Sequence, residues 1–210
     1  MPKSQSISMS VIRRLPRYYR FLYDLMQNGV VRISSRDLAA RMGLTASQIR
    51  QDLNCFGGFG QQGYGYIVEQ LYTEIGRILG VDEPASAVLI GAGNLGCAIA
   101  NHINFESRGI RLCGIFDDAP ALAGTRIQNL PVQPTTELSA FCKDQKPTIA
   151  ILCIPKEAAP ALVKELMGLG VQSFWNFSHY DIAFDHPEAV VENVHLGDSL
   201  LTLAYQTKAE

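Results

Sequence analysis

The sequence predicts an α/β protein with a winged helix-turn-helix, then a Rossmann-like parallel sheet, and finally a C-terminal helix. After residue 85, short apolar runs alternate with helical patterns, which is typical of a parallel sheet covered on both faces. Before residue 80 the chain shows helical spacing and one glycine-rich stretch. We therefore place domains at residues 1–80, 81–196 and 197–210, with the first boundary in the segment Gly80–Pro84.

Composition limits the class of protein. With 210 residues, 47% of them hydrophobic, the chain can bury one large core or two modest ones. No apolar run reaches the roughly 18 residues that a membrane span needs, and the polar segment Ser4–Ser10 is unlike a signal peptide. The five cysteines form no C-x-x-C pair, which argues against a zinc site or a disulfide framework. We expect a cytoplasmic protein that meets no membrane.

Charge is divided unevenly along the chain. Residues 1–80 hold ten Lys and Arg against five Asp and Glu, whereas residues 81–210 hold eight against fifteen. A basic first third on an otherwise acidic protein indicates one domain that binds a polyanion and one that does not.

The first third carries signals for four helices. A helix from Leu15 ends at Asn28-Gly29, and Ser34 begins a second helix that Gly43 ends. Thr45 begins a third, so two short helices joined by a tight turn make a helix-turn-helix. The glycine-rich segment 56–66 predicts a β-wing, and a further helix follows over residues 68–79.

The third helix carries the residues expected to read DNA. Ser47, Arg50 and Gln51 face outward; Arg50 suits guanine or a phosphate, and Gln51 suits adenine. The basic, aromatic first helix is expected to brace the phosphate backbone. Tyr64 and Tyr66 on the wing either enter a minor groove or seat the wing on its own domain. The alternatives for this unit are a solvated helix face and a protein-interaction module.

The rest of the chain alternates strands with helices. The expected strands are 87–90, 112–116, one near 131–132, 148–154, 171–176 and 189–194. The expected helices are 95–105, 136–141, 156–169 and 198–205. The last helix is apolar around most of its surface, which indicates burial against a partner such as a second copy of the chain.

A G-x-G-x-x-G motif, Gly91 to Gly96, joins the first of these strands to its helix. In a nucleotide-binding turn the first glycine permits the tight bend, the second lets a pyrophosphate approach, and the third lets the helix lie close to the strand. Asp117 ends the next strand, 21 residues after Gly96, where a carboxylate binds a ribose hydroxyl and disfavours a 2′-phosphate. The motif therefore predicts NAD(H) in preference to NADP(H).

Cys153 and Pro155 end a later strand at the carboxyl edge of the sheet, where ligands of such sheets bind. Cys153 either touches the nicotinamide or fills the core. The four histidines show no metal-ligand spacing, so no metal site is expected. No catalytic set is evident, and only about 130 residues follow the boundary, nearly all needed by a dinucleotide fold. That length favours a sensor over an enzyme.

Taken together, these motifs resemble the Rex family of bacterial redox-sensing transcriptional repressors over nearly the whole chain. The segments that resemble its DNA-binding half are 14–20, 33–35, 48–53 and 56–66. Those that resemble its cofactor half are 91–96, 116–117, 155, 176–177 and 191–194.

The resemblance implies a homodimer that exchanges its C-terminal helices and binds a palindromic operator in double-stranded DNA. The operator is expected to be bound when NADH is low, and NADH binding is expected to close the dimer and release the DNA. The expected DNA contacts are Arg14, Arg17, Tyr18, Ser47, Gln48, Arg50, Gln51 and Tyr64. The expected NAD(H) contacts are Gly91, Ala92, Gly93, Asn94, Leu95, Gly96, His102, Asp117, Cys153, Pro155 and His195.

Some positions depart from the family pattern. His102 and His195 replace a Tyr and an Asp that, with an Arg (here Arg20), link cofactor state to domain closure. The negative partner for Arg20 is therefore missing. Basic residues of the family are replaced by Gln51, Gln61 and Gln62. Fewer cations predict a shallower salt dependence of DNA binding, and the two histidines predict an altered or pH-sensitive switch.

Two other functions fit parts of the sequence. One is a small NAD-dependent oxidoreductase, and the other is a sensor of a different nucleotide such as coenzyme A. A family member that has lost its NADH switch is a further alternative.

Overall fold

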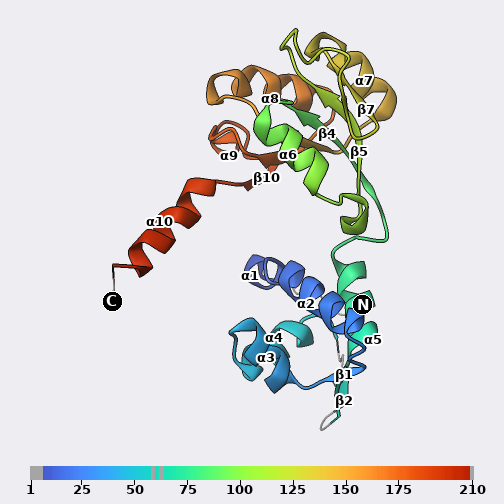
Figure 1. Ribbon diagram of the computed structural model, residues 1–210, viewed down its shortest axis with the longest axis vertical. Helices are drawn as coiled ribbons and strands as arrows, with labels where there is room; N and C mark the ends of the chain where they lie inside the picture. The colour runs from blue at the N-terminus through green and yellow to red at the C-terminus, as the bar shows by residue number, and fades with distance from the viewer. Residues whose placement is uncertain (1–6, 58–59, 62–63, 209–210) are drawn as a thin grey trace. The chain divides into compact units, whose positions relative to one another are not determined.

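The computed structural model describes residues 7–57, 60–61 and 64–208, and the chain divides into two compact units, Met1–Asp82 and Glu83–Glu210 (Figure 1). Parts of the predicted wing, Gly58, Phe59, Gln62 and Gly63, lie outside the described residues. Among the described residues, no helix is both long enough and apolar enough to cross a bilayer.

The first unit combines helices with a small antiparallel sheet. Its elements are α1 (Met9–Ile12), α2 (Leu15–Gln27), β1 (Arg32–Ile33), α3 (Ser35–Met42), α4 (Ala46–Asn54), β2 (Gly60–Gln61), β3 (Gly65–Ile67) and α5 (Val68–Ile78). The strands lie in the order β1-β3-β2, so β3 is paired on both sides. Strand β1 was not predicted, because two residues are too few to show an alternating pattern.

The predicted capping signals set the helix-turn-helix. The Ser34 hydroxyl accepts a hydrogen bond from the Asp37 N–H, and Thr45 caps the Gln48 N–H at 3.1 Å. Gly43 ends α3 with φ +62°, a conformation that glycine adopts without a steric cost. These caps fix the turn between α3 and α4, two helices that pack against each other.

A buried carboxylate joins α4 to α2. Asp52 is fully buried, and Arg14 donates to both of its oxygens at 2.7 Å. The hydroxyl of Tyr18 donates to Asp52 at 2.9 Å, and the side-chain amide of Gln48 donates at 2.7 Å. Burial acts to raise the pKa of Asp52, but these hydrogen bonds outweigh burial and the pKa is lowered. The ionised carboxylate therefore fixes α4 on α2.

The second unit is a seven-stranded sheet with helices on both faces. Its strands are β4 (Ala85–Ile90), β5 (Ile110–Phe116), β6 (Arg126–Ile127), β7 (Leu130–Gln133), β8 (Ile149–Leu152), β9 (Ser173–Asn176) and β10 (Val190–Asn193). Its helices are α6 (Asn94–His102), α7 (Leu138–Gln145), α8 (Ala159–Gly168), α9 (Ile182–Asp185) and α10 (Leu196–Gln206), with short 3-10 turns at η1 (Glu106–Arg108), η2 (Thr135–Glu137) and η3 (Lys156–Ala158).

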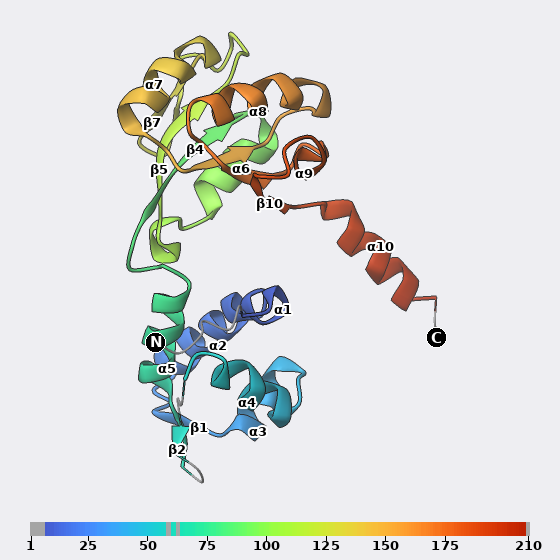
Figure 2. The ribbon, with the colours of Figure 1, turned by 180° about the vertical axis from the view of Figure 1, so that it is seen from behind.

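The strand order is β10-β9-β8-β4-β5-β7-β6, and every pair is parallel except β6 with β7. Alternate residues of β4 enter different cores: Ala87 and Leu89 pack with α6, whereas Val88 and Ile90 pack with α7 and α8. Accordingly, α6 is in front of the sheet in Figure 1 and α8 is in front in Figure 2. The predicted α/β fold is confirmed.

Some element bounds differ from the prediction. Helix α6 ends at His102 rather than at residue 105, because Ile103 is extended. The two-residue strand β6 and the four-residue helix α9 were not predicted, being too short for a periodic signal. Helix α10 has no buried residue, and its apolar side chains Leu196, Leu200, Leu201, Leu203 and Tyr205 are all exposed.

The Asp52 cluster predicts a stability that depends on pH. Replacing Asp52 by Asn should lower the free energy of unfolding by about 2–3 kcal/mol, because buried donors lose their charged acceptor. The pKa of Asp52 is lowered in the folded state, so its contribution is present above the unfolded value of about 3.9 and is lost as pH falls below it. Urea unfolding of both proteins between pH 7 and pH 3 measures this.

The exposed Asp24 of α2 gives the matched control, and Asp24→Asn should change stability by less than about 0.5 kcal/mol. Equal stability of Asp52→Asn and the wild type at pH 7 would contradict the role given to Asp52.

Candidate functional site

The carboxyl end of β4 is the point where the sheet changes direction. Strand β4 pairs with β5 on one side and with β8 on the other, so successive crossovers leave it in opposite directions. Ligands of open α/β sheets bind at such a point. A cavity of about 380 Å³ lies there, and its lining includes Gly91, Gly93, Asp117, Cys153 and Pro155.

The three glycines of the motif have different structural requirements. Gly91 has φ +94°, and a Cβ there would lie 2.3 Å from the Cys153 carbonyl oxygen. A Cβ on Gly96 would lie 1.8 Å from the Gly91 carbonyl oxygen, which α6 approaches closely. By contrast, a Cβ on Gly93 would meet nothing within 4 Å. The fold requires glycine at 91 and 96, whereas at 93 it leaves open the space a pyrophosphate needs.

The N-terminus of α6 is suited to an anion. Gly93 is its N-cap and offers no side chain to the first N–H groups of the helix. Asn94 and Leu95 are exposed in that first turn. Uncapped N–H groups and the helix dipole together favour a phosphate at this end.

Asp117 is held against the glycine turn. One carboxylate oxygen accepts from the Ala92 N–H at 2.6 Å and the other from the Ala119 N–H at 2.7 Å. A carboxylate has about four acceptor positions, so each oxygen retains capacity for a ribose hydroxyl. The neighbouring Asp118 accepts from the N–H and the hydroxyl of Thr135 and so holds the loop after β7. These residues fit a dinucleotide.

Cys153 and Pro155 reach the same cavity from the end of β8. Cys153 is half-buried, and burial raises the pKa of its thiol to about 12. A thiol this protonated at neutral pH is a poor nucleophile. Cys153 therefore shapes the cavity wall, and its chemistry does not indicate a redox role.

The two predicted cofactor histidines do not line this cavity within one chain. His102 is exposed at the end of α6, beside a different cavity with Arg111 and Gln128. His195 directly precedes α10, and its Nδ1 lies 3.2 Å from the Nδ1 of His179. Their contact with a nicotinamide across a dimer stays a prediction.

The exposed face of α4 carries three predicted DNA contacts. Ser47, Arg50 and Gln51 are all exposed there. Arg50 donates to the Ser35 hydroxyl at 3.1 Å, which holds its guanidinium toward the start of α3. On the wing, Tyr64 is 71% exposed, whereas Tyr66 belongs to the buried core. Of the two alternatives for the wing tyrosines, Tyr66 takes the seating role, and contact of Tyr64 with a DNA groove stays a prediction.

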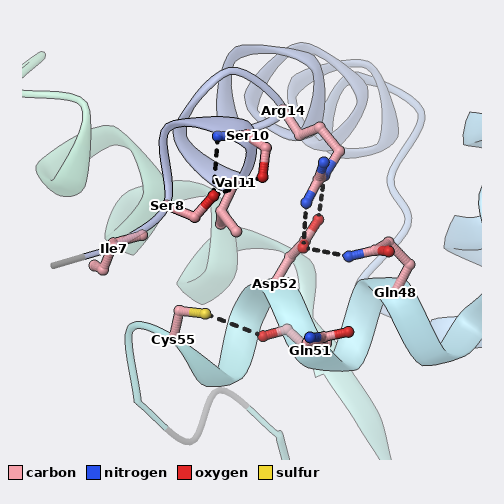
Figure 3. Close-up of a pocket in the computed structure, with 9 residues that line it drawn as sticks. All are labelled: Ile7, Ser8, Ser10, Val11, Arg14, Gln48, Gln51, Asp52 and Cys55. Carbon is pink, nitrogen blue, oxygen red and sulfur yellow. Dashed lines mark hydrogen bonds and ion pairs between the residues drawn. The ribbon is translucent and has the colours of Figure 1, made fainter. Parts of the chain in front are cut away.

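The prediction that Tyr18 contacts DNA is wrong, because its ring is fully buried and its hydroxyl is bonded to Asp52. Arg14 and Gln48 are bonded to the same carboxylate, so their first task is to support α4 (Figure 3). Both also line a cavity of about 370 Å³ beside α4, and their contact with DNA stays a prediction. Arg17 is exposed, with its guanidinium 5.8 Å from the centre of the Phe21 ring.

The comparisons with known proteins agree with both halves of this geometry. A family model described as "Putative DNA-binding protein N-terminus" matches residues 6–54, and one described as "CoA binding domain" matches residues 82–180. The redox-sensing transcriptional repressor Rex of Clostridium botulinum (strain Eklund 17B / Type B) is 50% identical over 206 residues, which make up 98% of this chain and 98% of that protein. The chain belongs to the Rex family.

Solved structures of the Rex family show the same fold. RSP in complex with beta-NAD+ and operator DNA has a TM-score of 0.89 and 50% identity, covering 97% of this chain and 93% of that one. RSP in complex with beta-NADH has a TM-score of 0.89 and 47% identity, covering 98% and 96%. The resemblance inferred from the motifs is thereby confirmed.

Sequence reasoning missed two structural features near the candidate sites. The burial of Asp52 has a weak signal, since it lies three residues after Ile49 and one before Leu53, on the inward face of α4. The meeting of His179 with His195 has no sequence signal, because 16 residues and a strand separate them.

Gly93, the N-cap of α6, and Gly96 within α6 predict losses of different size for the same substitution. Gly96→Ala should lower the free energy of unfolding by about 2 kcal/mol or more, because the added methyl overlaps the Gly91 carbonyl. Gly93→Ala should change it by less than about 1 kcal/mol, because its methyl enters open space. Thermal unfolding without ligand compares the two, and equal losses would contradict the packing argument.

Proposed function

We propose that this chain is an NADH-responsive DNA-binding repressor that binds its operator when NADH is low and leaves it when NADH binds. The single observation that carries the nucleotide half is the open space at Gly93, between two glycines that the fold itself requires. The DNA half is supported by the exposed polar face of α4 within a basic first unit.

Each residue of the nucleotide site has a distinct task in this proposal. The first turn of α6, over Asn94 and Leu95, binds the pyrophosphate with its N–H groups. Asp117 accepts a hydrogen bond from a hydroxyl of the adenosine ribose. Cys153 and Pro155 form the wall of the cavity on the β8 side. Ala92 fixes the carboxylate of Asp117 before any ligand arrives, which reduces the entropy lost on binding.

The crystallised relatives support this direction of the switch, since RSP has been crystallised with beta-NAD+ and operator DNA together and also with beta-NADH. A ligand shifts DNA affinity only by its differential affinity for the two states, so NADH must bind the DNA-free state better. His102 and His195 contribute to this discrimination in our proposal.

We further propose a homodimer joined through α10, with working domains at residues 1–80, 81–196 and 197–210. Support comes from the exposed apolar side chains Leu200, Leu201 and Leu203, which a lone chain leaves in water. A palindromic operator matches such a two-fold protein. Because a repressor acts where the chromosome is, we place the chain in the cytoplasm.

Regulation, rather than catalysis, is the role we assign to this chain. The curated relatives are named transcriptional repressors. Cys153 lines the nucleotide cavity, but the high pKa of its thiol makes it a poor nucleophile.

The central test is operator binding with and without NADH. Fluorescence anisotropy on an operator selected from random DNA should show affinity that falls with NADH and persists with NAD+ or coenzyme A. The Gly93→Ala variant should bind the operator with the same affinity without ligand and with NADH, NAD+ or coenzyme A, because its added methyl occupies the space that the pyrophosphate needs. Identical binding by the wild type with and without NADH would refute the sensing half and leave the DNA half standing.

Arg50 should contribute directly to operator affinity. Arg50→Ala should weaken binding by about 10- to 100-fold, corresponding to the roughly 1–3 kcal/mol of a specific arginine contact. A relaxed base preference would indicate base readout, and a salt slope reduced by about one would indicate a phosphate contact. Arg77→Ala is the matched control, since Arg77 on α5 is paired with Glu74 at 2.8 Å. Unchanged affinity of Arg50→Ala would remove Arg50 from the interface.

A further inference from the structure

Two histidines from separate parts of the second unit face each other through the same ring atom. The Nδ1 atoms of His179 and His195 are 3.2 Å apart, and the two ring planes are inclined at 88°. His179 lies in the loop between β9 and α9, whereas His195 is the residue before α10. Neither residue lines the nucleotide cavity.

The spacing of the two nitrogens matches that of two ligands on one metal ion. Zinc binds imidazole nitrogen at about 2.0–2.1 Å, so two ligands of a tetrahedral ion lie about 3.3 Å apart. A straight N–H···N hydrogen bond of this length would put the ring centres about 5.5 Å apart. Two imidazoles on one tetrahedral ion would have ring centres about 5.2 Å apart. The observed separation is 4.8 Å, nearer to that value than to the value for a straight hydrogen bond, so the two nitrogen lone pairs are inclined to each other rather than collinear.

The surrounding hydrogen bonds hold both histidines in place. Asn176 is 1% exposed, and its amide nitrogen donates to the Asn193 side chain and to the Tyr180 carbonyl, both at 2.8 Å. Its amide oxygen accepts from the N–H and the hydroxyl of Ser178 at 3.0 and 2.6 Å. One buried side chain therefore fixes the residues on both sides of His179 and the strand end two residues before His195. Such supporting contacts are what orient ligands in metal sites.

The backbone of His179 supports the same conclusion. It has φ +60°, a left-handed conformation that costs a residue with a side chain about 1 kcal/mol. The Asn176 hydrogen bonds on either side hold this conformation, and it directs the imidazole to His195.

We propose that the Nδ1 atoms of His179 and His195 together bind one divalent ion of the zinc, nickel or copper class per chain. Imidazole nitrogen favours these ions over magnesium or calcium. Among the described residues, no third His, Cys, Asp or Glu joins the pair in a metal-binding group, so water or another molecule completes the coordination. The bound ion links the loop after β9 to the root of α10.

Binding requires both Nδ1 atoms to be free of protons. In a tautomer in which one Nδ1 carries a hydrogen, that hydrogen lies between the two rings and blocks the ion. When the ion enters, that proton leaves Nδ1 and Nε2 of the same ring takes one up from water, so no net proton is released from neutral rings.

Copper binding by the untagged, chelator-treated full chain tests the site. Calorimetry should give one Cu²⁺ per chain, and electron paramagnetic resonance should show coupling to two imidazole nitrogens. His179→Ala and His195→Ala should each weaken binding about tenfold or more, because one of two imidazole ligands is lost. His186→Ala is the matched control, since His186 lies 3.7 Å from Glu188 and apart from the pair, and it should bind like the wild type.

Circular dichroism of each variant without metal confirms folding, and added Ni²⁺ should raise the unfolding temperature of the wild type and the control alone. If an alanine variant does not fold, His179→Gln or His195→Gln replaces it in the copper measurement, because glutamine keeps much of the bulk and polarity of histidine. Equal copper affinity in the wild type and both pair variants would overturn the proposal, as would a spectrum with a single imidazole nitrogen.

Discussion

The close approach of α6 to the end of β4 is the constraint on which the second unit depends. The helix begins within contact of the Gly91 carbonyl, and only glycine at 96 leaves room for that oxygen. Because the helix starts so near the strand tip, its N–H groups and the Asp117 carboxylate meet at one edge of the sheet. The same packing that buries Leu89 against α6 therefore creates an anion site without further binding machinery.

In the first unit, the corresponding constraint is the buried ion pair between Asp52 and Arg14. Asp52 attaches α4 to α2 through Arg14 and Tyr18, and Gln48 of α4 itself donates to the same carboxylate. Polar residues that look available for DNA therefore partly serve to orient the helix that presents Arg50 and Gln51. Removing one partner leaves a buried charge or hydroxyl unsatisfied, which makes the cluster sensitive to substitution. The cluster therefore favours one orientation of α4 on α2.

The two units thus rely on different interactions to set their functional surfaces. Backbone clearance at glycines shapes the nucleotide cavity, and side-chain hydrogen bonds to one carboxylate orient α4, the helix we propose to face DNA. Neither kind of interaction buries the apolar side of α10, because a single chain offers that side no partner surface. The root of that helix is where His195 meets His179, so metal binding and assembly would act on one segment.

The sequence by itself determined the fold class, the alternation of strands and helices, the glycine motif with Asp117, and the outward face of α4. These features are local or periodic, and spacing, caps and turn glycines record them directly. Only the tertiary structure decided that Tyr18 is buried, that Asp52 holds Arg14, and that His179 meets His195. The hydrogen bonds involved, including that of Tyr18 to Asp52, join residues at least 16 positions apart. Such contacts depend on how whole elements pack rather than on any local pattern.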